Sequence, residues 1–132
     1  MSSEQSSDAF TGPLAEADLG RLVADWLDWD AAGDLLGVSA SRVRALVKEH
    51  QLASGVPVAG EGPRVPALFI DDDGEIVKGL PGLLTVLHDG GYDDHECIAW
   101  IFIDADLPGR PIDALRENRG AEVKRRAQSM AF

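Results

Sequence analysis

The chemistry most available to this chain is the binding of anions by clustered basic side chains. Arg42, Arg44 and Lys48 lie close together in "SASRVRALVKEH" (residues 39–50), and Arg64 follows in the next segment. Guanidinium and ammonium groups bind phosphate oxygens, and an arginine also pairs with the edge of guanine. Serine hydroxyls bind phosphates or base edges as well. These residue types predict a DNA-binding surface made of Ser39, Ser41, Arg42, Arg44, Lys48 and Arg64.

This basic segment lies in an acidic chain. The 132 residues include 23 acidic and 12 basic ones, and the net charge is -11 at pH 7. Residues 38–66 nevertheless carry four basic and two acidic side chains. Residues 114–132 carry five basic and two acidic side chains. Because salt screens charges beyond about 10 Å, a local basic face can bind double-stranded DNA. The acidic remainder weakens non-specific binding and slows the approach.

The residues around these cations have the spacing of two helices joined by a tight turn. Residues 30–36 predict a short helix, and Gly37 predicts a turn with positive φ. Residues 39–49 predict a second helix that is capped by Ser39. Ala32 and Gly33 are small enough for the helices to cross closely. The apolar residues that would hold the two helices together are Leu36, Val38, Val43 and Leu46. The pattern is typical of a helix-turn-helix whose second helix enters the major groove. A purely structural helical hairpin is the alternative.

The flanking segments predict the rest of a winged helix-turn-helix over residues 14–66. Apolar residues between Leu19 and Leu27 have helical spacing, so residues 14–28 predict a first helix, with Trp26 and Trp29 as core anchors. Residues 53–66 are rich in Gly and Pro with valines between them. They predict a short, irregular β-hairpin in the position of a wing.

Residues 67–132 predict a C-terminal helical domain. An Asp-Gly turn in "ALFIDDDGEIV" (residues 67–77) indicates a hairpin, and a leucine-faced helix then ends at Gly90-Gly91. Asp93 or Asp94 is predicted to cap the helix that follows. The stretch "LPGRPIDAL" predicts a turn that leads into a short helix. A basic helix then ends the chain. The inward residues of that last helix are Val123, Ala127 and Met130. Its basic residues either neutralise acidic neighbours or extend the DNA footprint. The predicted fold class is mainly α.

Three stretches together resemble an actinobacterial family of small winged helix-turn-helix DNA-binding regulators, over roughly residues 29–132. They are "DLLGVSASRVRALVKEHQL", "VKGLPGLLTVLHDGGYDDHECIAWIF" and "RPIDALRENRGAEVKRRAQSMAF". The resemblance implies an N-terminal winged domain that contacts DNA and a helical domain packed on it. Wings of that family carry more basic residues than "SGVPVAGEGPRVP", where Glu61 accompanies Arg64.

The second half is also similar to the toxin-binding domain of certain helix-turn-helix antitoxins. The likeness rests on the order "DDDGEIVKGLPGLL", "GGY", "AWIF" and "LPGRPIDALRENRGAEV". It implies that residues 67–132 bind a partner protein. We therefore predict a DNA-binding transcriptional regulator, with an antitoxin-like or other protein-interaction module as the alternative.

Catalytic and metal chemistry have few candidates. His88 and His95 lie among acidic residues, a pattern that suits a metal but is more typical of a solvated helix-loop-helix face with good caps. The acidic run at 71–75 lacks the spacing of a calcium loop. Cys97 is the one cysteine, so no disulfide can form within the chain, and no histidine-carboxylate pair is placed to activate it. We expect a non-enzymatic protein without a metal or cofactor.

The N-terminal residues 1–13 are Ser-rich and acidic and predict a disordered tail. Thr11, in "AFTGP", is a candidate phosphate acceptor for a Ser/Thr kinase, and a plain linker is the alternative. A phosphate would add about -2 charge and weaken DNA binding. The tail lacks the pattern of a signal peptide, and no apolar run approaches the roughly 20 residues of a membrane helix. We expect a cytoplasmic, nucleoid-associated protein with no membrane contact.

Overall fold

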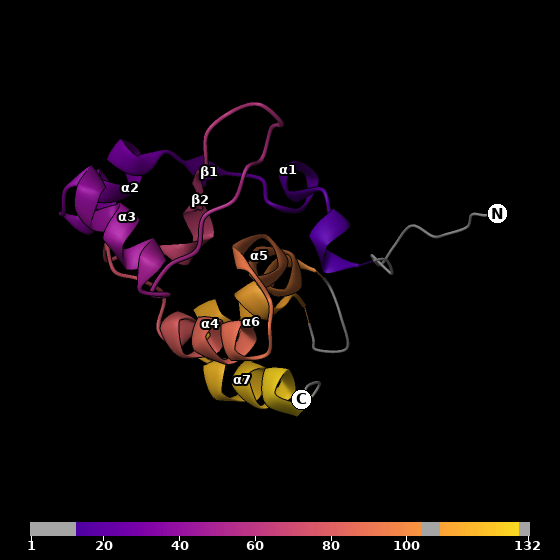
Figure 1. Ribbon diagram of the computed structural model, residues 1–132. Helices are drawn as coiled ribbons and strands as arrows, with labels where there is room; N and C mark the ends of the chain where they lie inside the picture. Colours follow the sequence, from indigo (N-terminus) through magenta and orange to yellow (C-terminus); the bar gives the residue numbers. More distant parts are fainter. Residues whose placement is uncertain (1–12, 104–108, 130–132) are drawn as a thin grey trace.

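Short helices surround an apolar core in the computed structural model, which describes residues 13–103 and 109–129 (Figure 1). Two strands, β1 (Trp26–Leu27) and β2 (Val65–Pro66), pair antiparallel, with Trp26 opposite Pro66 and Leu27 opposite Val65. The helices are η2 (Leu14–Glu16), α1 (Leu19–Leu22), α2 (Trp29–Leu36), α3 (Ala40–Lys48), η3 (Ala67–Phe69), α4 (Leu80–Asp89), α5 (Asp94–Phe102), α6 (Pro111–Arg116) and α7 (Gly120–Ser129). The chain is thus mainly helical with one small sheet. None of these helices combines the length and the apolar character that crossing a membrane requires.

The prediction of one helix across residues 14–28 is wrong. This segment forms η2, α1 and β1 in turn. Helix α1 stops at Val23, whose backbone is extended at φ -114° and ψ 120°, and the indole N–H of Trp26 donates a hydrogen bond to the Val23 carbonyl at 3.1 Å. The apolar residues are packed against the core as expected, because a short irregular segment held by a strand pairing can bury them as well as a helix can.

The buried apolar residues form one cluster that runs from Ala17 to Ala127. The leucine face predicted for α4 is confirmed, since its four leucines are fully buried: Leu80, Leu83, Leu84 and Leu87. Residues on both sides of position 66, such as Val43 and Leu84, belong to this one core. Within its C-terminal part, the rings of Phe69 and Phe102 lie 5.6 Å apart between centroids. The domain boundary at residue 66 stays a prediction.

Local signals set the ends of the C-terminal helices. Asp93 begins α5 with a capping box, in which its Oδ1 accepts from the Glu96 N–H at 2.9 Å and Glu96 Oε1 accepts from the Asp93 N–H at 3.0 Å. The turn after η3 is closed by a single bridge between Ile70 and Ile76. The inward residues predicted for α7 are confirmed for Val123 and Ala127, while Met130 lies outside the described residues.

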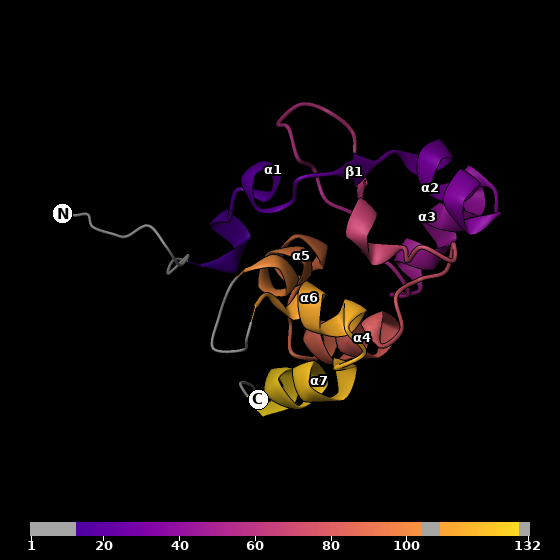
Figure 2. The same cartoon turned by 180° about the vertical axis from the view of Figure 1, so that it is seen from behind.

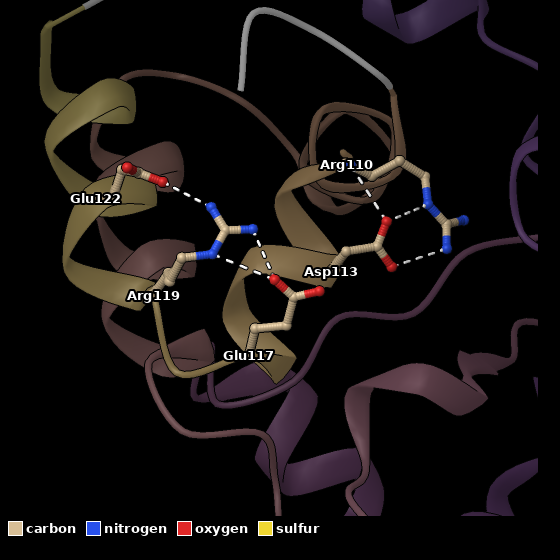
Figure 3. Close-up of polar contacts among 5 residues, drawn as sticks. All are labelled: Arg110, Asp113, Glu117, Arg119 and Glu122. Atoms are coloured by element: carbon tan, nitrogen blue, oxygen red, sulfur yellow. Dashed lines mark hydrogen bonds and ion pairs between the residues drawn. The ribbon is translucent and has the colours of Figure 1, made fainter. Parts of the chain in front are cut away.

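Two arginines of the C-terminal half are engaged by nearby carboxylates (Figure 3). Arg110 makes a bidentate pair with Asp113, at 3.0 Å from Nε and 3.1 Å from Nη2. Arg119 donates to Glu117 at 2.8 Å and to Glu122 at 2.9 Å. Arg119 therefore neutralises acidic residues of its own segment, whereas neither arginine lies in α7, and the role of the basic residues of that helix stays a prediction.

Arg116 has a structural role too, because its Nη1 donates to the carbonyls of Leu68 at 2.8 Å and Ile70 at 3.1 Å. It thereby ties α6 to the segment that follows β2. Lys124 and Arg125 are exposed on α7. Helix α4 lies between α7 and α3 in both views of the molecule (Figures 1 and 2). This placement favours a role for α7 apart from the basic surface of α3.

The Arg110–Asp113 pair makes a testable contribution to acid stability. Hydrogen bonds from Arg110 hold the pKa of Asp113 below its ordinary value of 3.8. The stabilisation is therefore present above that value and is lost as the pH falls through the lower folded pKa. We expect Asp113→Asn, which keeps an acceptor for the Arg110 N–H, to lower the free energy of unfolding at pH 7 by less than about 1 kcal/mol, since the two side chains are 34% and 36% exposed.

Urea denaturation at a series of pH values between about 7 and 3 measures this effect. The difference between wild type and variant should shrink toward the acid end. Asp89→Asn, at an exposed position with no ion-pair partner among the described residues, is the control and should show no such trend. A difference that stays constant across the pH series would contradict the assignment.

Candidate nucleic-acid interface

Helices α2 and α3 form the helical hairpin that the sequence predicts. Gly37 adopts the left-handed conformation at φ 75°, and the N–H groups of Gly37 and Val38 both donate to the Gly33 carbonyl, at 2.8 and 2.9 Å. Ser39 then caps α3, its hydroxyl accepting from the Arg42 N–H at 3.1 Å. The cap prediction is confirmed, and α3 ends at Lys48, one residue before the predicted end.

The close approach of the two helices depends on Gly33. A Cβ atom at this position would lie 2.6 Å from the Val38 carbonyl oxygen, which is too close for any real contact. Gly37 has open space around it, so its requirement is the positive φ alone. Of the four apolar residues predicted to hold the two helices together, Val43 is fully buried and Leu36 and Leu46 are partly buried against the core. The prediction is wrong for Val38, which is 37% exposed because it lies in the turn, whereas the small residue Ala32 is fully buried.

Five of the candidate DNA-binding residues lie in α3 or at its N-cap, and all five are exposed: Ser39, Ser41, Arg42, Arg44 and Lys48. Val43 is fully buried on the opposite side, with Leu46 and Val47 partly buried beside it. Successive residues of an α-helix are rotated by about 100°. Ser41 and Lys48 therefore lie in the middle of the outer face, with Arg42 on one flank and Arg44 on the other.

Each flanking arginine has a partner within the protein. Arg42 Nη1 lies 3.4 Å from Glu49 Oε2, and both side chains are about half exposed. The guanidinium carbon of Arg44 lies 5.6 Å from the centroid of the Trp29 ring, a cation–π contact across the hairpin. Trp29 is partly buried against the core, as predicted. Its ring therefore gives the Arg44 guanidinium a fixed surface to pack on.

Residues 55–64 form a loop where the sequence predicts an irregular β-hairpin. Gly55 and Arg64 exchange two backbone hydrogen bonds, of 2.9 and 2.8 Å, and this isolated bridge closes the loop. The loop projects at the top of Figures 1 and 2. Arg64 Nη2 lies 3.5 Å from Glu61 Oε1, so the one arginine of the loop is paired with its one glutamate. Val56 and Val58 are 43% and 52% exposed.

The C-terminal end of α3 rests on the second half of the protein. His50, at φ 61°, stacks on His88 with ring centroids 3.8 Å apart. Asp94 Oδ2 accepts from the Ser54 N–H at 3.2 Å, and its Oδ1 lies 3.0 Å from His88 Nε2 without the geometry of a hydrogen bond. These contacts, which the sequence did not predict, fix the orientation of α3 relative to α4 and α5.

The histidines suggested as metal ligands are engaged separately. His95 Nε2 lies 3.0 Å from the Ala17 carbonyl, whereas His88 contacts His50 and Asp94. Within residues 13–103 and 109–129, no group of three or more His, Cys, Asp or Glu side chains is arranged to hold a metal ion. Burial, followed by the charges of neighbouring acids, raises the pKa of the Cys97 thiol far above its ordinary range. The thiol is therefore protonated and poorly nucleophilic at neutral pH.

The fold and this surface define a mainly helical protein with a small two-stranded sheet, consistent with a winged helix-like fold. A family model described as "Rv2175c C-terminal domain of unknown function" matches residues 77–131. The "DNA-binding protein Rv2175c" of Mycobacterium tuberculosis is 42% identical over 118 residues, which cover 80% of each chain. The NMR structure of Rv2175c superposes with a TM-score of 0.70 at 38% identity and covers 82% of each chain. The chain therefore belongs to the Rv2175c family.

This membership agrees with the resemblance to a DNA-binding family that the sequence suggested. The likeness of the second half to antitoxins receives no support from these relatives and stays a prediction. Thr11 lies outside the described residues, so its modification stays a prediction as well.

The steric role of Gly33 predicts a clear order among glycine variants. Gly33→Ala should lower the free energy of unfolding by about 2 kcal/mol or more, because backbone atoms must move apart. Gly37→Ala should cost about 1 kcal/mol for its left-handed conformation. Gly62→Ala, in the exposed loop with no atom near the new Cβ, is the control and should be close to neutral. Urea denaturation followed by tryptophan fluorescence measures all three, and equal stability of the Gly33 and Gly62 variants would refute the packing argument.

Proposed function

We propose that this protein binds double-stranded DNA, with α2 and α3 as a helix-turn-helix and residues 55–64 as its wing. The observation that carries the proposal is the outer face of α3, where exposed polar and basic residues lie opposite a buried apolar face. The relative named a DNA-binding protein supports it. Helix α3 would lie in the major groove, which is about 12 Å wide and admits an α-helix.

The positions on α3 suggest a division of roles. Ser41 and Lys48, in the middle of the outer face, would meet base edges or the floor of the groove. Arg42 and Arg44, on the two flanks, would each reach a phosphate backbone, one on either side of the groove. The capped N-terminus of α3 adds backbone N–H groups and the positive end of the helix dipole near a phosphate.

The charge balance predicts modest, salt-dependent binding. The candidate cations are few, and Arg64 in the loop is already paired with Glu61. About four phosphate contacts correspond to a slope of log K against log[salt] near -3 to -4.

We further propose that this binding regulates transcription and associates the protein with the nucleoid. A phosphate on Thr11 would oppose it by adding about -2 charge.

A second candidate function is binding of a partner protein by the C-terminal half. It is favoured by the family model, which matches residues 77–131 as a unit of its own. Under this alternative, full-length protein would retain a partner from its native cell extract even after its DNA-binding residues are replaced. Under the main proposal, replacing the DNA-binding residues would instead prevent the protein from recovering DNA.

Fluorescence anisotropy with labelled genomic fragments tests the main proposal directly. We expect the double variant Arg42→Ala/Arg44→Ala to bind at least about 10-fold more weakly at low salt, with a slope shallower by about 2, because two phosphate contacts are lost. The control is Lys124→Ala/Arg125→Ala, which removes the same charge from the exposed face of α7 and should change binding little. A salt slope near zero for wild type, or equal losses in the two double variants, would refute the assignment to α3.

A further inference from the structure

Two cations of the proposed interface are each paired with a glutamate of their own segment. Arg42 contacts Glu49 at 3.4 Å on α3, and Arg64 contacts Glu61 at 3.5 Å in the loop. Residues 38–66 contain two acidic residues in all, and these are the two. Every carboxylate side chain in this segment therefore lies against a cation that would otherwise face phosphate.

The other two cations are held differently. Arg44 lies over the face of Trp29, an arrangement that leaves its charge uncompensated. Lys48 is exposed, and the described residues provide no ion-pair partner for it. The interface thus has two basic side chains whose charge is available and two whose charge is neutralised by a neighbour.

We propose that Glu49 and Glu61 are specificity-determining residues that limit the affinity of this surface for DNA of arbitrary sequence. The inference rests on the proposed function. A cation already paired with a carboxylate gains less from a phosphate, because a similar contact must first be broken. The freed carboxylate also stays close to the phosphate, which it repels. Both effects weaken the purely electrostatic binding that every DNA sequence offers.

The geometry of the pairs suits exchange. The side chains of Arg42 and Glu49 are 50% and 52% exposed, and those of Arg64 and Glu61 are 43% and 50% exposed. Pairs this exposed are weak, so a site whose base contacts hold α3 in place can draw both arginines onto phosphate. A site without those contacts meets a surface with roughly half the available positive charge.

The test uses the full chain, a labelled duplex of mixed sequence and fluorescence anisotropy over a range of salt concentrations. We expect Glu49→Gln and Glu61→Gln each to raise the affinity about 3- to 5-fold at low salt, and the double variant about 10-fold. On this mixed-sequence duplex the wild-type slope of log K against log[salt] should fall short of the value near -3 to -4 that four phosphate contacts give, and each arginine released should restore up to about 0.9 of it. In an Arg42→Ala background, Glu49→Gln should have a much smaller effect, because its partner is gone.

Glu122→Gln is the matched control, since it removes the same charge from a glutamate paired with Arg119 on the C-terminal half. If Glu49→Gln and Glu61→Gln change binding no more than this control does, net charge alone acts and the inference fails while DNA binding stands. A loss of affinity in Glu49→Gln would also overturn it, since Glu49 would then be positioning Arg42 for DNA. If wild type shows no salt-dependent binding, the proposed function itself fails, and the inference with it.

Discussion

The helical hairpin depends on how closely the Val38 carbonyl approaches Gly33. The approach leaves no room for a Cβ atom at Gly33. In the same turn, the Gly33 carbonyl accepts hydrogen bonds from the N–H groups of both Gly37 and Val38. The direction in which α3 leaves the turn follows from it. Once α3 has this direction, Val43 is buried and the polar and basic residues of the helix face outward. The candidate interface is therefore a consequence of a backbone contact between α2 and the turn that precedes α3.

The charge pattern then explains how an acidic chain can present such a surface. Its net negative charge arises outside residues 38–66, where four basic side chains outnumber two acidic ones and which include the exposed face of α3 and the loop. Within that segment the carboxylates are paired with arginines, which reduces the field without removing the cations. In the proposed function, such a surface would favour contacts that are geometrically specific over general attraction to phosphate.

Local signals made the hairpin predictable from the sequence. Gly37 and Ser39 act through their own backbone and side-chain preferences, so a single sequence suffices to place the turn and the start of α3. The first helix was mispredicted because apolar spacing reports burial, and a one-turn helix followed by a strand buries the same residues. The Arg44–Trp29 and His50–His88 contacts join separate elements, and no local pattern encodes which elements meet.

The shared core gives the C-terminal half a part in the proposed function even without a contact to DNA. His50, two residues after the end of α3, stacks on His88 of α4, while the N–H of Ser54 donates a hydrogen bond to Asp94 of α5. Because these groups fix the far end of α3, the C-terminal helices help to determine the angle at which the outer face is presented. A protein partner bound to those helices would therefore meet the same framework that orients α3. The two functions considered for this chain are physically compatible, and one provides a route by which the other could be regulated.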